Sequence, residues 1–80
     1  MHVAVELSLY PLADDFIPPI RDFIDRLKAR AGVAVVTNSM STQVSGEFNP
    51  VFDALRAEIA RTLEGPIRAV IVMKVLGGAD

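Results

Sequence analysis

The strongest constraint on the fold is a run of alternating residues near the amino terminus that ends at a proline. Apolar side chains occupy every second position, as on one face of an extended strand: Val3, Val5, Leu7 and Leu9. The opposite face carries a carboxylate, a hydroxyl and a phenol: Glu6, Ser8 and Tyr10. Pro11 has no amide proton to donate to a neighbouring strand, so the strand is predicted to stop there. One face would build a core, and the other would be free for a ligand or a partner.

An amphipathic helix is predicted to follow, because apolar residues recur at helical spacing over residues 16–27. The pair Asp14–Asp15 precedes it and is interpreted as capping and first-turn carboxylates. The pair Pro18–Pro19 is tolerable only near the first turn, where amide protons lack partners within the helix. Gly32 is predicted to end this helix.

The second half of the chain predicts two strands, a helix and a final strand. Residues 33–36 and 41–48 read as strands with a tight connection between them. Asn49 would cap the second helix, and Pro50 would take its first position. Gly65 and Pro66 would end that helix, and residues 67–76 would form the last strand.

The order strand, helix, strand, strand, helix, strand predicts an α+β fold of the ferredoxin-like type. We expect one domain over residues 1–80, with a four-stranded antiparallel sheet and both helices on one face. The first and last strands are expected in the centre of the sheet. Val70 and Val72 would then share the open face with the polar residues of the first strand. Because so small a chain buries little of its surface, we expect a homodimer or homotetramer that covers this face.

Four segments resemble the YkoF-like family of thiamine and hydroxymethylpyrimidine binders and its single-domain relatives. They are Ser8 to Pro11, Asp14 to Ile17, the stretch from Ser41-Thr42 to Gly46, and Val51 to Ala54. The resemblance implies the same ferredoxin-like fold and a polar pocket for the pyrimidine. It also implies a binding role in vitamin trafficking or salvage. The family member that gives its name carries two such domains in one chain, so a single domain would need to associate to recreate the surfaces between them.

Eight polar residues are candidates for contact with such a ligand: Glu6, Ser8, Tyr10, Asp15, Asn38, Ser39, Ser41 and Thr42. A carboxylate such as Glu6 or Asp15 can accept the amine of an aminopyrimidine or face a cationic thiazolium ring. Hydroxyls and amides both donate and accept hydrogen bonds. Structural alternatives stay open, since Glu6 could simply pair with Lys74 or Arg68 and the residues near Asn38 could serve only the turn.

Aromatic residues could also enclose a planar heterocycle, because ring faces stack without demanding a particular pattern of substituents. Tyr10, Phe48 and Phe52 are the candidates for such a sandwich. Phe52 lies on the apolar stripe of the second helix and is the one most easily explained as core.

Composition argues against several other classes of protein. The net charge of −2 with both signs interspersed provides no basic patch for nucleic acid, and there is no cysteine for disulfides or thiolate chemistry. His2 has no companion ligands, and no serine has a nucleophile's constellation, so we expect no catalytic residue, metal or cofactor. No apolar run reaches the length of a membrane span, and no targeting segment is recognisable, which favours a cytoplasmic protein. Two alternatives remain: a cofactor-free monooxygenase or isomerase, and a regulatory or structural oligomer.

Overall fold

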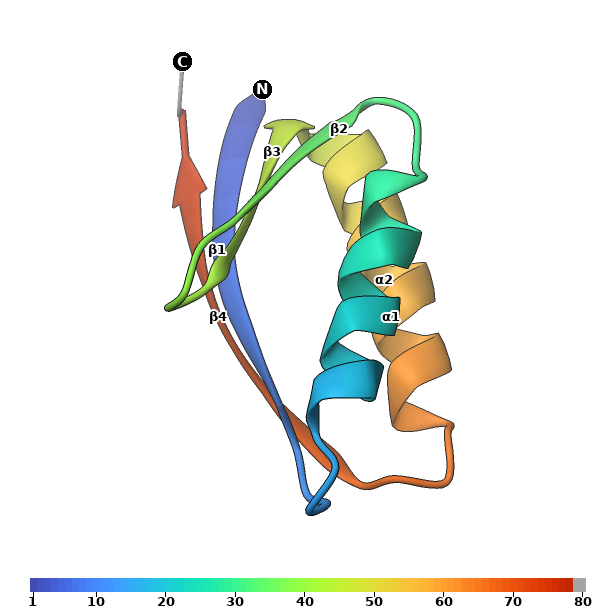
Figure 1. Cartoon of the computed structure of the whole chain (residues 1–80). Coiled ribbons are helices and arrows are strands. Elements are labelled where there is room, and N and C mark those ends of the chain that lie inside the picture. The colour runs from blue at the N-terminus through green and yellow to red at the C-terminus, as the bar shows by residue number, and fades with distance from the viewer. Residues whose placement is uncertain (79–80) are drawn as a thin grey trace.

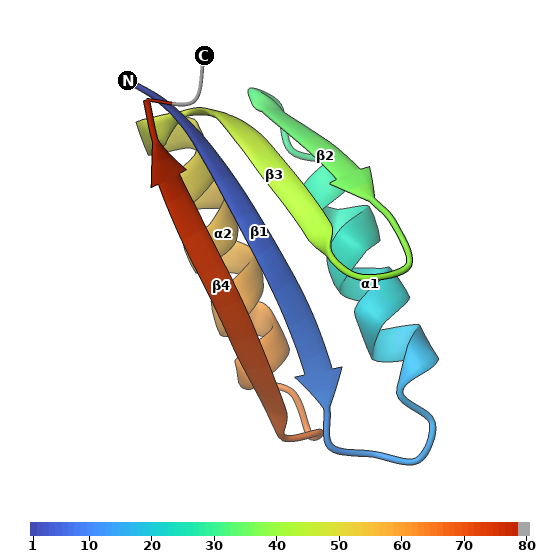
Figure 2. The same ribbon diagram turned by 90° about the vertical axis from the view of Figure 1, so that its left-hand side faces the viewer.

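The four strands of the sheet are antiparallel and lie in the order β2-β3-β1-β4, with both helices against one face (Figures 1 and 2). The computed structural model describes residues 1–78. Along the chain the elements are β1 (His2–Pro11), α1 (Ile17–Lys28), β2 (Val33–Thr37), β3 (Thr42–Glu47), α2 (Phe48–Leu63) and β4 (Ala69–Gly77). The predicted α+β, ferredoxin-like class is therefore confirmed.

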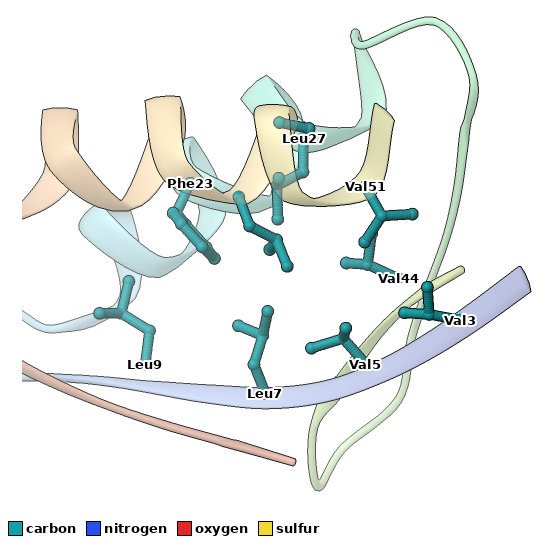
Figure 3. Close-up of a cluster of buried hydrophobic side chains, with 10 residues drawn as sticks. Val3, Val5, Leu7, Leu9, Phe23, Leu27, Val44 and Val51 are labelled. Carbon is teal, nitrogen blue, oxygen red and sulfur yellow. The ribbon is translucent and has the colours of Figure 1, made fainter. Parts of the chain in front are cut away.

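The hydrophobic core lies between the helices and the inner face of β1, as the alternation predicts. Val3, Val5 and Leu7 are each at most 2% exposed, and Figure 3 shows them in a row along β1 facing Phe23 and Leu27. Fully burying one such side chain contributes about 1.5–3 kcal/mol. The row therefore anchors β1 to the helices and fixes its polar residues on the opposite face.

The expected position of the last strand is wrong, because β1 and β3 form the centre of the sheet and β4 is an edge. β1 pairs with β3 on one side and with β4 on the other, so its predicted position in the centre of the sheet is correct. The predicted facing of β4 is nevertheless confirmed: Val70 lies opposite Tyr10 and Val72 opposite Ser8. Both valines are about half exposed on the open face, at 48% and 53%.

The predicted capping of α1 by Asp14 and Asp15 is wrong, although the helix begins close to Pro18 and Pro19 as expected, at Ile17. Phe16 occupies the cap position, no side chain caps the helix, and its first turn holds no acidic residue. Pro18 and Pro19 fall at the first positions, where their missing amide protons cost nothing. The prolines therefore decide where the helix starts, and the pair Asp14–Asp15 lies in the preceding bend.

Two other boundaries differ from the predictions. α1 ends at Lys28, and Gly32 instead serves the turn into β2, where its φ of 82° is readily adopted by glycine. α2 begins at Phe48 with Glu47 as its cap residue, so Asn49 is inside the helix and caps nothing. Terminal positions commonly shift by one or two residues, but the cap itself is a different residue.

A buried ion cluster joins α1 to α2 on the outer side of the core. Glu58, whose side chain is 7% exposed, accepts hydrogen bonds from Arg26 at 2.7 Å and from Arg30 at 2.7 and 2.9 Å. Arg26 also binds Asp22 and donates to the Thr62 hydroxyl at 2.6 Å. Burial raises the pKa of Glu58, but the hydrogen bonds and charges of the two arginines outweigh it and hold the pKa below 4.5. The carboxylate is thus ionised and fully paired.

Candidate functional site

The candidate site lies where β1 runs on beyond the end of β3. Pairing between β1 and β3 stops at Leu7 opposite Thr42, whereas pairing between β1 and β4 continues to Pro11. Figure 2 shows β1 and β4 extending past the turn that joins β2 to β3. The last residues of β1 therefore have a neighbouring strand on one side only.

This overhang forms one wall of a hollow of about 460 Å³, here called the hairpin hollow. Its other walls come from the β2–β3 connection and from the apolar side of α1. The lining residues are Leu7, Ser8, Leu9, Tyr10, Pro11, Phe16, Ile20, Ile24, Thr37, Asn38, Ser39, Met40, Ser41 and Thr42. A hollow of this size that combines apolar walls with a few polar groups matches the usual character of small-molecule sites.

Six of the eight candidate residues predicted from the sequence line this one hollow: Ser8, Tyr10, Asn38, Ser39, Ser41 and Thr42. They come from two segments far apart in the chain, and the pairing of β1 with β3 brings them together. The sequence places them on the same strand ends, but only the strand register makes them neighbours.

The connection between β2 and β3 is held by the side chain of Asn38. Its carbonyl oxygen accepts hydrogen bonds from the amides of Met40 at 2.7 Å and Ser41 at 2.9 Å. The backbone amide of Asn38 donates to the Ser41 carbonyl at 3.1 Å. Asn38 thus makes the turn it was predicted to make, and it presents its amide NH₂ group as the remaining polar part of the side chain.

The hydroxyl groups around the hollow differ in how far they are already engaged. The Thr37 and Thr42 hydroxyl oxygens lie 3.1 Å apart, and Thr42 is buried at 5% exposure. The Ser8 hydroxyl donates to the Met40 carbonyl over a long 3.4 Å. No hydrogen bond to the Tyr10 phenol or the Ser39 hydroxyl occurs within residues 1–78, and Tyr10 is 53% exposed. The two threonine hydroxyls are thus already engaged with each other, and the less engaged groups remain for a ligand.

Backbone groups of Leu9 add a donor and an acceptor that side-chain patterns could not reveal. The Phe48 amide donates to the Met1 carbonyl, which identifies the odd-numbered residues of β1 as those that bond to β3. Leu9 is odd-numbered but lies beyond the last β3 partner, so this rule directs its N–H and C=O toward the hollow with no strand to receive them. Unpaired backbone groups next to a buried side chain favour a hydrogen-bonding ligand.

Glu6 lies beside the hairpin hollow and not in it. Its carboxylate accepts a hydrogen bond from the Ser41 hydroxyl at 3.3 Å, and the Lys74 ammonium is 3.7 Å from its other oxygen. It lines a separate, open hollow of about 530 Å³ on the outer face of the sheet, together with Gln43 and Ser45. Ser41, which lines the hairpin hollow, therefore links that hollow to the carboxylate.

Asp15 is the one candidate that the fold sets apart from the others. It lines a hollow of about 550 Å³ at the other side of the β1–α1 connection, between that loop and the end of α2. That hollow also includes Arg26 and Asp22, which pair with each other. Asp15 thus belongs to a different surface from the remaining seven candidates.

The predicted aromatic sandwich is wrong in its partners. Phe48 and Phe52 stack on one another with ring centroids 4.7 Å apart, and Phe48 lies beside the start of β1. Tyr10 lies at the opposite end of β1, and the aromatic residue that shares its hollow is Phe16, which is 48% exposed. The sequence pattern places Phe16 on the apolar stripe of α1. Its position before the first turn of the helix instead lets its ring line the hairpin hollow.

The lining of the hairpin hollow contains no carboxylate, imidazole, ammonium or guanidinium group among the residues described. Tyr10 is its one ionisable side chain. Over residues 1–78, no three histidine or acidic side chains gather where they could hold a metal ion. In the same part of the chain, the helices are too short or too polar to cross a lipid bilayer. The chemistry available in the hollow is hydrogen bonding and contact with planar or apolar surfaces.

Comparison with known proteins relates this fold to three solved structures. A hypothetical protein of Methanocaldococcus jannascii has 23% identity and a TM-score of 0.81, with 99% of this chain and 82% of that chain aligned. A Streptococcus pneumoniae protein has 23% identity and a TM-score of 0.85, over 98% and 88% of the two chains. A Thermotoga maritima protein provisionally assigned to thiamine biosynthesis or salvage has 19% identity and a TM-score of 0.79, over 94% and 82%.

At these identities, the structural matches establish the shared fold. No curated protein matches the sequence. The family model described as the YKOF-related Family matches residues 2–75, which include both helices and nearly all of the sheet. That match covers the strand end, the turn and the helix start that carry the resemblance in the sequence. The chain belongs to the YKOF-related family.

Proposed function

We propose that this protein binds thiamine or its hydroxymethylpyrimidine moiety in the hairpin hollow, without catalysis, in vitamin trafficking or salvage. The observation that carries the proposal is the convergence of six predicted polar residues on one hollow with apolar and aromatic walls. Membership of the YKOF-related family and the assignment of the Thermotoga maritima protein to thiamine metabolism support the choice of ligand.

The chemistry of the hollow suits an aminopyrimidine. Such a ring presents nitrogen acceptors and an amine donor in one plane. The Asn38 amide and the Ser8 and Ser39 hydroxyls provide donors, and the hydroxyls also provide acceptors. Tyr10 and Phe16 add aromatic surface on which the ring can rest.

We expect the Glu6 carboxylate to favour the whole vitamin over its pyrimidine half. Thiamine joins the pyrimidine to a permanently cationic thiazolium ring. A pyrimidine bound near Ser41 would bring that cation toward Glu6, whose present cationic neighbour, Lys74, is exposed and 3.7 Å away. An exposed pair of this kind contributes little to stability, so exchanging Lys74 for the ligand costs little.

A binding role is favoured over catalysis by the side chains of the hollow. Tyr10 is the one lining residue that could transfer a proton, and its phenol is not paired with a base among the described residues. The cofactor-free enzyme alternative needs a polar network around its substrate that includes such a base. We therefore assign the hollow to recognition. We also propose that the protein acts in the cytoplasm.

Assembly into a homodimer or homotetramer is part of the same proposal. The open face of the sheet exposes apolar side chains beside the polar column of β1, including Val70, Val72 and Leu76 at 48–63% exposure. A second subunit over this face would remove that surface from water and shield the Glu6 site.

A thermal unfolding titration with thiamine, hydroxymethylpyrimidine and thiamine diphosphate tests the proposal. A ligand at about 100 times its dissociation constant adds roughly 2.7 kcal/mol, which raises the melting temperature of a domain this size by about 10 °C or more. No shift with any of the three compounds would contradict the vitamin-binding function.

Matched variants locate the site. Ser8→Ala removes a hydroxyl from the hollow and is expected to weaken binding about three- to tenfold, whereas Ser45→Ala on the open face leaves it unchanged. Glu6→Gln is expected to weaken thiamine and leave hydroxymethylpyrimidine nearly unaffected, because only thiamine carries the cation. Equal effects of Glu6→Gln on both compounds would assign that carboxylate a structural role.

A further inference from the structure

β4 is a long edge strand with an apolar character on both faces. It spans nine residues, Ala69–Gly77, and its large side chains are exposed: Val70, Val72, Met73, Val75 and Leu76. Lys74 is its single charged residue, and the strand contains no proline. Within residues 1–78, Figure 2 shows no helix or strand beyond β4 on its outer side.

The register identifies which backbone groups of β4 lie on the free edge. The Leu12 amide donates to the Arg68 carbonyl, so even-numbered residues of β4 bond to β1. The odd-numbered residues therefore direct their N–H and C=O groups outward: Ala69, Ile71, Met73, Val75 and Gly77. The edge offers a complete set of donors and acceptors to another strand.

The other edge strand of the sheet, β2, is protected from pairing, so the two edges differ. β2 has only five residues, Val33–Thr37. The surface beside Thr37 is lined by charged residues of α1, namely Arg21, Asp25 and Lys28. Short length and neighbouring charges are devices by which proteins prevent edge strands from pairing. β4 is nine residues long and carries Lys74 as its single charged residue, so it is less protected than β2.

We propose that two copies of this chain pair edge to edge through antiparallel β4 strands, with Met73 opposite the partner's Met73. A twofold axis requires each outward-facing residue to meet another outward-facing residue. Centring the axis on Met73 pairs Ala69 with the partner's Gly77, so all nine residues of the strand take part. The product is a continuous eight-stranded sheet, since each copy contributes four strands.

Side chains in this register are compatible. Ile71 meets the partner's Val75 on the helix side, and Val70 meets the partner's Leu76 on the open side. Lys74 meets the partner's Val72, so the single cation of each strand is not placed opposite its own copy. The pairing buries apolar groups that are now exposed, and it leaves the Glu6 and Lys74 pair intact. It does not depend on whether the hairpin hollow binds thiamine.

A charge-swap experiment tests both the interface and its register. Met73→Lys and Met73→Glu each place like charges directly opposite one another, and each is expected to raise the dissociation constant of the dimer roughly tenfold or more. An equal mixture of the two variants should restore association, because opposite charges then meet. Sedimentation velocity and native mass spectrometry measure the species present.

Leu63→Lys is the matched control, since Leu63 is 50% exposed at the end of α2 and lies outside both the β4 edge and the open face of the sheet. It should leave the association unchanged. A monomeric wild-type protein at high micromolar concentration would overturn the proposal. So would Met73 variants whose largest species is the same as that of the wild-type protein, or a mixture that associates no better than either variant alone.

Amide hydrogen exchange of the wild-type protein keeps the proposal testable if the variants do not fold. Pairing through the β4 edge predicts slow exchange for the amides of Ile71, Met73 and Val75, comparable to that of the even-numbered amides bonded to β1. Dilution below the dissociation constant should make only the odd-numbered amides fast. Fast exchange of these amides in the associated protein would place the interface elsewhere and overturn the proposal.

Discussion

The two faces of β1 differ sharply in how far their side chains are buried. On the helix side, Val3, Val5 and Leu7 are at most 2% exposed, whereas on the open side the Glu6 side chain is 46% exposed and Tyr10 53%. The inner face provides the burial that holds a small domain together, and the outer face contributes little to folding. Side chains on the open side are therefore free to serve recognition, and those on the helix side are not.

The sharpest test of this contrast is to shorten one leucine on each side. Leu7→Ala removes a side chain that is 2% exposed and leaves a cavity, so it should lower the free energy of unfolding by about 2–5 kcal/mol in urea denaturation. Leu76→Ala, at 63% exposure on the open side, should cost less than about 1 kcal/mol in the monomer. Similar losses for both would break the comparison.

Gly46 tests how tightly the helix side is packed. Its φ is 148°, and an added Cβ would lie 2.7 Å from the Gly32 carbonyl oxygen. Gly46→Ala should therefore cost about 2–3 kcal/mol, because a backbone atom must move and the conformation itself is strained. Gly77→Ala adds a methyl group in open space and serves as the control. A neutral Gly46→Ala would show that the Gly32 turn relaxes freely.

The buried ion cluster gives the helix side a pH dependence. Because the pKa of Glu58 is held below 4.5 in the folded state, its stabilising contribution is present above pH 4.5 and is lost as the pH falls through the folded pKa. Glu58→Gln should cost about 1–2 kcal/mol near neutral pH, with part of the pairing screened because Arg30 is 41% exposed. Urea denaturation at pH 7 and pH 3 measures both effects.

Glu64→Gln, on an exposed residue at the end of α2, is the control for Glu58. It should leave the pH dependence unchanged. A Glu58→Gln protein that loses as much stability on acidification as the wild type would assign the acid sensitivity to other carboxylates.

The smallest effect is expected on the open side. Lys74→Ala removes an exposed partner 3.7 Å from Glu6 and should change the free energy of unfolding by less than about 0.5 kcal/mol. In the proposed function it should strengthen thiamine binding, because the cationic ligand no longer competes with an ammonium group. Calorimetric titration separates this gain from stability, and weaker binding would show that Lys74 is a direct contact.

The elements and the inner face of β1 were predictable because alternation and helical spacing report burial directly. The strand order was not, since alternation says which face a residue occupies but nothing about its neighbours. For this reason β4 was expected in the centre of the sheet, whereas the structure places β3 there and β4 at the edge. The predicted helix caps failed for a local reason. At Phe16 and Glu47 the chain enters a helix without a side-chain cap, so Asp14, Asp15 and Asn49 only resemble caps.

The candidate site was partly accessible for the same reasons. Ser8 and Tyr10 follow from alternation, and Asn38 and Ser41 follow from turn chemistry. Phe16 and the backbone of Leu9 were missed, because their role depends on where β3 stops relative to β1. That offset is a property of two paired segments and has no signature in either one alone.

The length of the β2–β3 hairpin therefore determines the size of the hairpin hollow. Residues 38–41 connect the two strands, and β3 begins at Thr42, so its pairing with β1 ends at Leu7. Lengthening each strand by one pair of residues would bring a backbone neighbour to Leu9 and fill the space with chain. Relatives that share the fold could thus open, narrow or close the hollow through changes in hairpin length alone, while every core contact of β1 stays the same.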